Sequence, residues 1–265
     1  MAQAAQRRGV MVFENCAARG VETSAGVVSH IVTERGAVKC DAVVLAGGAW
    51  SRRFCFNMGI HLPQLMVLNS VMRSAPFDYD MKHSVAGSGV ALRKRHDGGY
   101  TIADDTYNTA DISPDSFRLL PDFAGTLMEN WRDFRFRVGP RFWGEAKLKR
   151  RWALDEQSPF EQVRILDPVP HKANLNSGLK ALHRVHPAFK HVPMLDTWAG
   201  AIDVTPDIVP VISAVDSTPG FFMATGFSGH GFGLGPGAGK LMAEIVTGEE
   251  PCVDASPFGY DRCVR

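Results

Sequence analysis

The sequence has almost no excess of charge of either sign. Its 29 Lys and Arg residues stand against 28 Asp and Glu residues, which leaves a formal net charge of +1. Such a chain lacks the long-range field that draws nucleic acid or an anionic membrane to a protein. Residues 147–152 combine basic and aromatic side chains, but an isolated run of this kind is typical of a solvated loop or helix end. We therefore expect no nucleic-acid partner.

Cysteines are few, and long apolar runs are missing. The five cysteines are odd in number and never form a Cys-x-x-Cys pair, which argues against a disulfide framework and a zinc site. His183 and His186 have the spacing of metal ligands on a helix, but no carboxylate or cysteine stands at ligand spacing nearby, so we expect a solvated helix face and no metal. No apolar run approaches the roughly 20 residues that cross a bilayer. We expect a cytoplasmic protein without a transmembrane segment.

The order of apolar and polar residues along the chain predicts an α/β fold. Residues 2–9 have the composition of the last turns of a helix, and residues 10–13 of a short strand. Residues 27–40 predict a hairpin that turns at residues 34–36. The apolar run 42–46, closed by two glycines, is typical of a strand buried on both faces of a parallel sheet.

The middle of the chain predicts a separate α+β lobe. Its expected strands are residues 67–73, 85–93 and 100–104, and its expected helices are residues 116–134 and 176–185. Residues 220–248 return to the first pattern, with a strand at 221–225, a glycine-rich turn and a helix that begins near Pro236.

Residues 226–239 are the most informative segment. Seven glycines in fourteen positions let the backbone approach a ligand and direct several N–H groups at it. The alternative is a tight structural turn. The segment is no P-loop, because Leu234 and Leu241 occupy the first-glycine and hydroxyl positions of that motif. Its match to the loose dinucleotide fingerprint is weak, since too little chain follows for a βαβ unit.

Four ordered segments together carry a resemblance. The Trp-Ala-Gly segment beginning at Trp198, taken with residues 43–51, 62–76 and 224–247, resembles the D-amino-acid oxidase/glycine oxidase-like family of FAD-dependent oxidoreductases. The resemblance covers nearly the whole chain. It implies a Rossmann-type FAD-binding domain, here incomplete, interrupted by a substrate domain with a large mixed sheet. The implied segments are residues 1–56 and 197–265 for the FAD-binding domain and 57–196 for the substrate domain.

The resemblance also implies an activity and a cofactor site. Family members remove hydride from the carbon next to an amine, transfer it to flavin N5, and pass electrons to oxygen or a carrier; we expect a small amine or amino acid as the substrate and FAD as the cofactor. The helix from Pro236 would direct its positive end at the flavin N1/O2 edge. His230 is the residue to which we assign a catalytic role, as a group that positions the ring. The implied cofactor-binding residues are Cys16 and Ala17 at the adenine, Gly47, Gly48 and Trp50 in the crevice, and Gly226, Ser228, Gly229, His230, Gly231, Phe232 and Gly233 along the isoalloxazine.

The substrate position departs from the family pattern. Amine-oxidising relatives with a Trp-Ala-Gly-x-Arg-Pro motif grip the substrate carboxylate with the arginine, but Ile202 and Asp203 stand here instead. Either another arginine such as Arg73 or Arg93 takes this task, or the substrate carries a different polar group. Asp203 either pairs with an amine or caps a turn. Tyr100 and Tyr107 are further candidates for the pocket.

In the family, the Gly-x-Gly-x-x-Gly unit that binds the pyrophosphate lies near the start of the chain, and nothing like it is found at the start of this sequence. We therefore expect a truncated member, an incomplete gene model, or one half of a split protein whose second chain supplies that unit. The alternative function is a flavin-free, catalytically inactive remnant or a partner subunit of a split oxidase.

Overall fold

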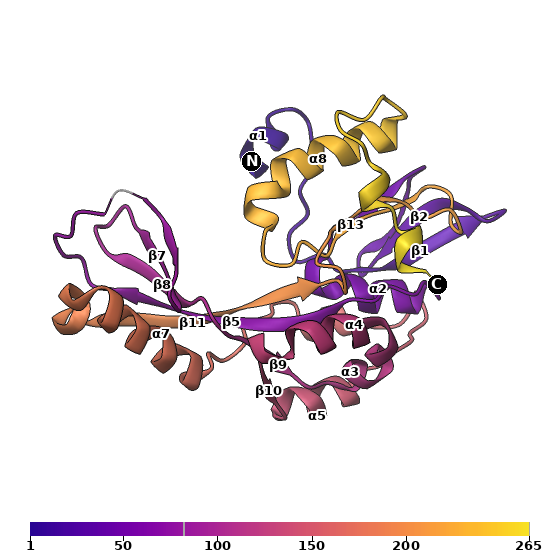
Figure 1. Ribbon diagram of the computed structural model, residues 1–265. Helices are drawn as coiled ribbons and strands as arrows, with labels where there is room; N and C mark the ends of the chain where they lie inside the picture. Colours follow the sequence, from indigo (N-terminus) through magenta and orange to yellow (C-terminus); the bar gives the residue numbers. More distant parts are fainter. Residues whose placement is uncertain (82, 265) are drawn as a thin grey trace.

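The computed structural model describes residues 1–81 and 83–264 and arranges them as three β-sheets with helices packed against them (Figure 1). This confirms the expected mixed α/β fold class. None of the helices in these residues is both long and apolar enough to cross a membrane.

One sheet joins segments from the two ends of the sequence. Strand β4 (Val43–Leu45) pairs in parallel with β13 (Phe221–Thr225), which pairs in antiparallel with β12 (Val211–Ala214). Phe221 and Met223 are fully buried beneath helix α2 (Ser51–Asn57), which contributes Phe54 to the same core. Helix α8 (Gly231–Thr247) packs Leu241 and Met242 against Ile212 on β12.

A second, antiparallel sheet lies beside this one. It consists of β1 (Ala18–Ser24), β2 (Val27–Thr33) and β3 (Gly36–Lys39), so the predicted hairpin between β2 and β3 is confirmed. The backbone N–H of Val28 donates to the carbonyl of Pro219, and the Val28 side chain joins the core around Phe221.

The large mixed sheet is organised around β5 (Leu65–Ser74). One edge of β5 pairs with β11 (Met194–Val204) along nearly its whole length, and the other edge pairs first with β9 and then with β8. The remaining strands extend this sheet outward: β6 (Val85–Gly87), β7 (Val90–Lys94), β8 (Tyr100–Asp104), β9 (Asn108–Asp111) and β10 (Phe134–Arg137).

The two faces of the large sheet have different surroundings. Side chains alternate between the faces, so Met66, Leu68 and Met72 share one of them, and Met72 packs there with Leu182 of helix α7 (Lys172–Val185). In Figure 1, α7 and the helices α3 (Pro114–Arg118), α4 (Leu120–Asn130) and α5 (Pro140–Lys147) lie on one side of β5 and β11, whereas α8 lies on the other. We call these the helix-covered face and the open face. The short helices α1 (Ala2–Gln6) and α6 (Pro159–Gln162) complete the α-helical elements of the described residues.

Several predicted elements are wrong for identifiable reasons. Residues 10–13 form no strand and are exposed. The strand at residues 42–46 is not buried on both faces, because β4 lies at the edge of its sheet and Val44 is 41% exposed. Residues 85–93 form a hairpin rather than one strand, since Ser88 and Gly89 adopt positive φ angles of 55° and 87°. The predicted helix at 116–134 is divided, and Pro121 stands in the first turn of α4, where a new helix can begin.

The predicted division into domains stays a prediction. The bounds at residues 56 and 57 fall at the end of α2, but those at 196 and 197 fall inside β11. Because β11 runs unbroken beside β5 through this point, the two implied domains share a strand there.

Candidate functional site

Three segments meet where β11 and β13 end. The turn that follows β4 contains the 3₁₀-helix Gly48–Trp50 and leads into α2, and the turn that follows β13 leads into α8. The side chain of Asp203, near the end of β11, lies between them. The structure therefore brings Gly48, Gly226 and Asp203 together, although they are distant in sequence.

Asp203 holds the glycine-rich turn from within the protein. Its Oδ2 atom accepts hydrogen bonds from the backbone N–H of Gly226 at 2.7 Å and from Nε2 of Gln64 at 3.1 Å, and the Thr225 hydroxyl lies 3.2 Å away. Its carbonyl oxygen accepts the N–H of Ser228 at 2.9 Å. Of the two alternatives for Asp203, the structure shows a carboxylate that caps a turn.

Buried hydroxyl and amide groups extend this network toward α2. Thr225 and Ser51 are both fully buried, and their hydroxyl oxygens are 2.9 Å apart. Gln64, which is 2% exposed, donates to Thr225 and accepts the backbone N–H of Arg52. A buried polar network whose members are paired is rigid, so the two turns have a fixed relative position.

Helix α8 begins earlier than its sequence predicts. His230 is its N-cap and Gly231 its first residue, so Pro236 is the sixth residue of the helix and not the first. The N–H groups of Gly233 and Leu234 both reach the His230 carbonyl, at 3.1 Å each. Within the described chain no backbone partner takes the N–H groups of Gly231 and Phe232, so the positive end of α8 lies at Gly231.

The first turns of α8 border empty space. A Cβ atom added at Gly233, Gly235, Gly237 or Gly239 would meet no atom within 4 Å beyond its chain neighbours and the adjacent backbone of its own helix, and Gly48 likewise has open space beyond its chain neighbours. Phe232 is 98% exposed. Gly226 is different, because a Cβ there would stand 2.5 Å from Thr205 and its φ is +76°, so this position requires glycine. The result is a cradle of backbone that small residues leave accessible to a flat ligand.

The open face of the large sheet lies beneath this turn. Ile202 is on that face, and a Cβ at Gly229 would contact it at 3.7 Å. Gly200, the next residue on this face, is exposed and has open space above it. Asn69, its cross-strand partner, donates to Asn108 and carries a buried Oδ1 atom for which the described residues provide no partner. Trp198 follows on the same face and is 37% exposed.

The structure separates Arg73 from these residues. Arg73 is on the open face, but it is six residues along β5 from Val67, the cross-strand partner of Ile202, which places it roughly 20 Å away at the ordinary strand rise. Its guanidinium pairs with Asp196 at 2.6 Å. Arg93 is exposed on β7 and lies toward the same end of the sheet as Arg73, since both residues are cross-strand neighbours of Thr101.

Other predicted residues also have assigned neighbours. Tyr100 is fully buried and donates to the carbonyl of Tyr79, so it is a core residue and not part of a pocket. Tyr107 lies under the guanidinium of Arg135, at 4.2 Å from the ring centroid. Ala17, which follows Cys16, donates its N–H to Glu34 at 2.7 Å.

Two sequence interpretations of surface segments need correction. His186 is no free surface histidine, because its Nδ1 lies 2.8 Å from the Tyr79 hydroxyl. Trp152 is 6% exposed and donates to the carbonyl of Arg19, so residues 147–152 end in a buried anchor rather than a solvated loop. Among the described residues, no group of three or more His, Cys, Asp or Glu side chains could hold a metal ion.

Sequence reasoning missed the polar residues that support the site. Ser51 begins α2, Thr225 ends β13 and Gln64 immediately precedes β5; all three lie within the segments that carry the resemblance, and this position was the available signal. Their burial could not be predicted, because it depends on the meeting of three segments that are far apart in sequence.

Comparison with known proteins gives a consistent family. The family model described as FAD dependent oxidoreductase matches residues 1–245. The chain is 26% identical to a D-amino acid dehydrogenase of Bradyrhizobium diazoefficiens over 99% of this chain and 50% of that protein. It is 23% identical to a glycine oxidase of Pseudomonas aeruginosa over 93% of this chain and 53% of that protein. The chain thus spans about half the length of the curated relatives it matches.

A solved structure agrees more closely. The L-amino acid deaminase from Proteus myxofaciens, determined in complex with anthranilate, superposes with a TM-score of 0.92 at 36% identity. The superposition covers 98% of this chain and 58% of that one.

Proposed function

Because the chain belongs to the family of FAD dependent oxidoreductases, we propose that it supplies the flavin-facing turn and the substrate wall of an enzyme that oxidises the C–N bond of an amino acid or a small amine. The observation that carries this proposal is the accessible backbone cradle at the start of α8, held by Asp203 above the open face of the sheet.

The residues of the cradle fit a flavin. Gly48 and Gly233 leave room for a flat ring, and the N–H groups of Gly231 and Phe232 can donate to its polar edge. When bound there, FAD would supply a two-electron acceptor, at N5, for the hydride of the substrate carbon. The proposed holding residues are Gly47, Gly48, Trp50, Gly226, Ser228, Gly229, His230, Gly231, Phe232 and Gly233, with Cys16 and Ala17 proposed for the adenine end.

This chain's own residues have distinct tasks in the proposal. The carboxylate of Asp203 fixes the Gly226 N–H and thereby the path of the turn. The positive end of α8 favours negative charge that develops beside Gly231. His230, the N-cap, positions the ring from the edge of the cradle and holds no buried proton-transfer partner in the described residues.

The substrate wall proposed here is mostly apolar. Ile202 offers van der Waals contact where related enzymes with the Trp-Ala-Gly-x-Arg-Pro motif have a guanidinium, and Trp198 extends the apolar surface. Asn69 is the nearest polar side chain on that wall, and its unpartnered Oδ1 can accept a hydrogen bond from a substrate N–H. We therefore propose that the amine is recognised by an amide oxygen, and that Arg73 takes no part.

The test is whether the 265-residue chain retains added FAD. Visible flavin bands that co-elute with the protein from a desalting column support the proposal, and their bleaching by an amine or amino acid without oxygen supports the reaction. Asp203→Asn should weaken FAD binding by about tenfold or more, because a charge-assisted hydrogen bond contributes about 1.5–3 kcal/mol.

Asp196→Asn is the matched control, since it removes a carboxylate from the same strand at an exposed ion pair. A folded, colourless chain would contradict the proposal and favour the flavin-free alternative. Equal FAD affinity of the two variants would refute the role assigned to Asp203.

A further inference from the structure

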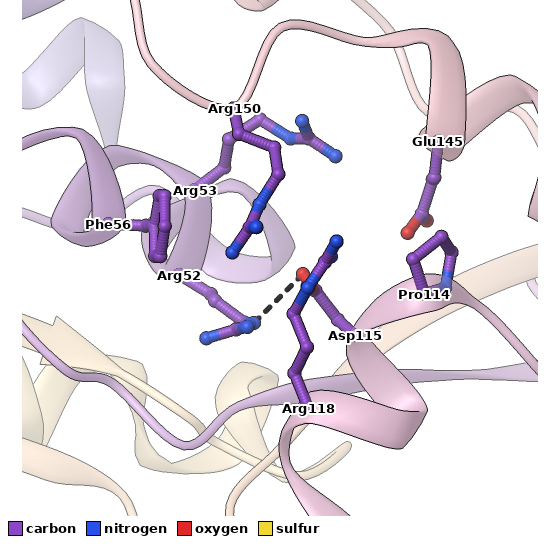
Figure 2. Close-up of a pocket in the computed structure, with 8 residues that line it drawn as sticks. All are labelled: Arg52, Arg53, Phe56, Pro114, Asp115, Arg118, Glu145 and Arg150. Carbon is purple, nitrogen blue, oxygen red and sulfur yellow. Dashed lines mark hydrogen bonds and ion pairs between the residues drawn. The ribbon is translucent and has the colours of Figure 1, made fainter.

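Four arginine side chains converge on a pocket away from the glycine-rich turn. Figure 2 shows them between α2, α3 and the segment that follows α5, with Arg52 and Arg118 beside Asp115 and Arg150 beside Phe56. The pocket is lined by Arg52, Arg53, Phe56, Pro114, Asp115, Arg118, Glu145 and Arg150.

The carboxylates in this pocket are already paired. Asp115 accepts Arg52 through Oδ2 at 2.9 Å and Arg118 through Oδ1 at 2.8 Å. Glu145 accepts Arg141, a residue outside the pocket, at 2.6 Å. Among the described residues, Asp115 is therefore the single carboxylate that pairs with these guanidinium groups, and it pairs with two of the four.

Arg53 and Arg150 have no ion pair with any described residue. Arg53 is half-buried and uses one N–H on the carbonyl of Lys149 at 3.2 Å. The guanidinium carbon of Arg150 lies over Phe56, 4.3 Å from the ring centroid, a contact that holds the group without neutralising its charge. Most N–H donors of both side chains thus have no hydrogen-bond partner among residues 1–81 and 83–264.

The positively charged side chains in the pocket repel one another. The pKa of Arg53 is below its ordinary value because burial removes water from the guanidinium and because Arg52 and Arg150 repel it. The pKa of Arg150 is lowered by the same two causes, with Arg118 as the main neighbour. An anion with several acceptor oxygens would relieve both effects at once.

We propose that this pocket is a binding site for a small oxyanion, a phosphate or a carboxylate, which the guanidinium groups of Arg53 and Arg150 hold. Arg52 and Arg118 are kept in position by Asp115 and add to the field. The same Arg52, Arg53, Asp115 and Glu145 also border a larger cavity on the helix-covered face, beside Met66 and Leu68. The oxyanion is therefore either a free small anion or the acidic end of a molecule that occupies the larger cavity.

Binding can be measured without flavin or turnover. Phosphate should raise the melting temperature of the full chain above that in chloride at equal ionic strength, and calorimetric titration should show one saturable site. Arg53→Gln and Arg150→Gln should each raise the phosphate Kd by about tenfold or more, since each removes charge-assisted hydrogen bonds. Arg93→Gln removes an exposed arginine on β7 and should leave the Kd unchanged.

The repulsion gives a second, independent readout. Without phosphate, Arg150→Gln should melt no lower than the unchanged chain, because it removes a like-charged neighbour of Arg118. A lower melting temperature of Arg150→Gln without phosphate would overturn the proposal. So would an equal effect of phosphate on the melting temperatures of all variants, because salts that are excluded from protein surfaces stabilise folded proteins in general.

Succinate and phosphate distinguish the two sources of the anion. Competition between them at one site, with similar Kd values, indicates a free-anion site. Preferential binding of a longer dicarboxylate, lost in Arg150→Gln, indicates a ligand that extends into the larger cavity. Because neither arm uses FAD, a colourless chain would contradict the proposed function and leave this proposal standing.

Discussion

Glu161 is a single carboxylate that joins distant parts of the chain. It accepts Nε and Nη2 of Arg19 at 2.9 Å and 3.0 Å, and also the N–H and hydroxyl of Ser158, both at 2.9 Å. The side chain of Glu161 is 6% exposed. Arg19 above all, together with Ser158, lowers the pKa of Glu161 to about 2.

Glu161→Gln should therefore destabilise the protein at neutral pH and flatten its response to acid. A carboxylate whose pKa is lowered by folding contributes stability above its unfolded pKa, and that stability is lost as the pH falls toward 2. We expect a loss of about 2 kcal/mol at pH 7, in line with hydrogen bonds to charged groups. Urea unfolding at several pH values measures both effects. Glu156→Gln is the control, because its partner Lys149 forms an exposed pair; an equal loss in this variant would contradict the prediction.

For single residues, the sequence shows which positions are unusual, but it does not show what each side chain contacts. The sequence shows that Ile202 and Asp203 depart from the family motif. The fold shows what each does: Ile202 faces the open face of the sheet below Gly229, whereas Asp203 points to the other side and accepts the N–H of Gly226. The prediction that Tyr100 lies in a pocket is wrong, because the sequence of an alternating strand does not show which of its two faces is buried in the core. The arginine pocket could not be foreseen, since its members come from three separate segments.

At the scale of elements, α8 combines poor helix formers with an exposed position. Glycine costs a helix about 1 kcal/mol relative to alanine, and Pro236 cannot donate to the carbonyl four residues before it. Nothing packs against Gly233 or Gly239 where a side chain would be. Packing therefore gives no reason for these glycines, whereas a ligand that approaches the backbone gives one.

Gly233→Ala and Gly239→Ala separate these two explanations. Both should raise the free energy of unfolding by up to about 1 kcal/mol, because alanine loses less conformational freedom in a helix. Gly233→Ala alone should also weaken FAD binding, since its Cβ would enter the space above the first turn, whereas Gly239 lies further along the helix. Chemical denaturation and flavin titration measure the two quantities. Equal FAD affinity of the two variants would show that the cradle does not extend to Gly233.

Elements with a clear periodic pattern were predicted well, and those that depend on neighbours were not. Strands β8 and β13 have their predicted bounds because alternating or apolar runs end at turn residues. Residues 10–13 have the composition of a strand, but no described strand pairs with them. The start of α8 was misplaced because Pro236 is typical of a first helical position, and the structure has it inside the helix instead.

At the scale of the whole molecule, apolar side chains are exposed on two sides. Phe232 and Leu234 are 98% and 49% exposed at the start of α8, above the open face of the sheet. Phe117 is 64% exposed and belongs to α3, a helix that lies on the opposite side of the large sheet (Figure 1). Exposed apolar patches mark surfaces that bind a ligand, a partner or another copy.

Phe232→Ser should reduce self-association of the chain, and Phe117→Ser should reduce it less. The reason is that Phe232 is 98% exposed and Phe117 is 64% exposed, so Phe232 can contribute more apolar area to a contact between copies. Sedimentation velocity over a range of concentrations measures this directly. If the cradle binds FAD, saturating FAD should lower the association of the unchanged chain and of Phe117→Ser, because the flavin covers the same surface. If neither Phe232→Ser nor FAD changes the self-association, the surface through which copies associate lies elsewhere. The exposure of Phe232 would then not be explained by a contact between copies.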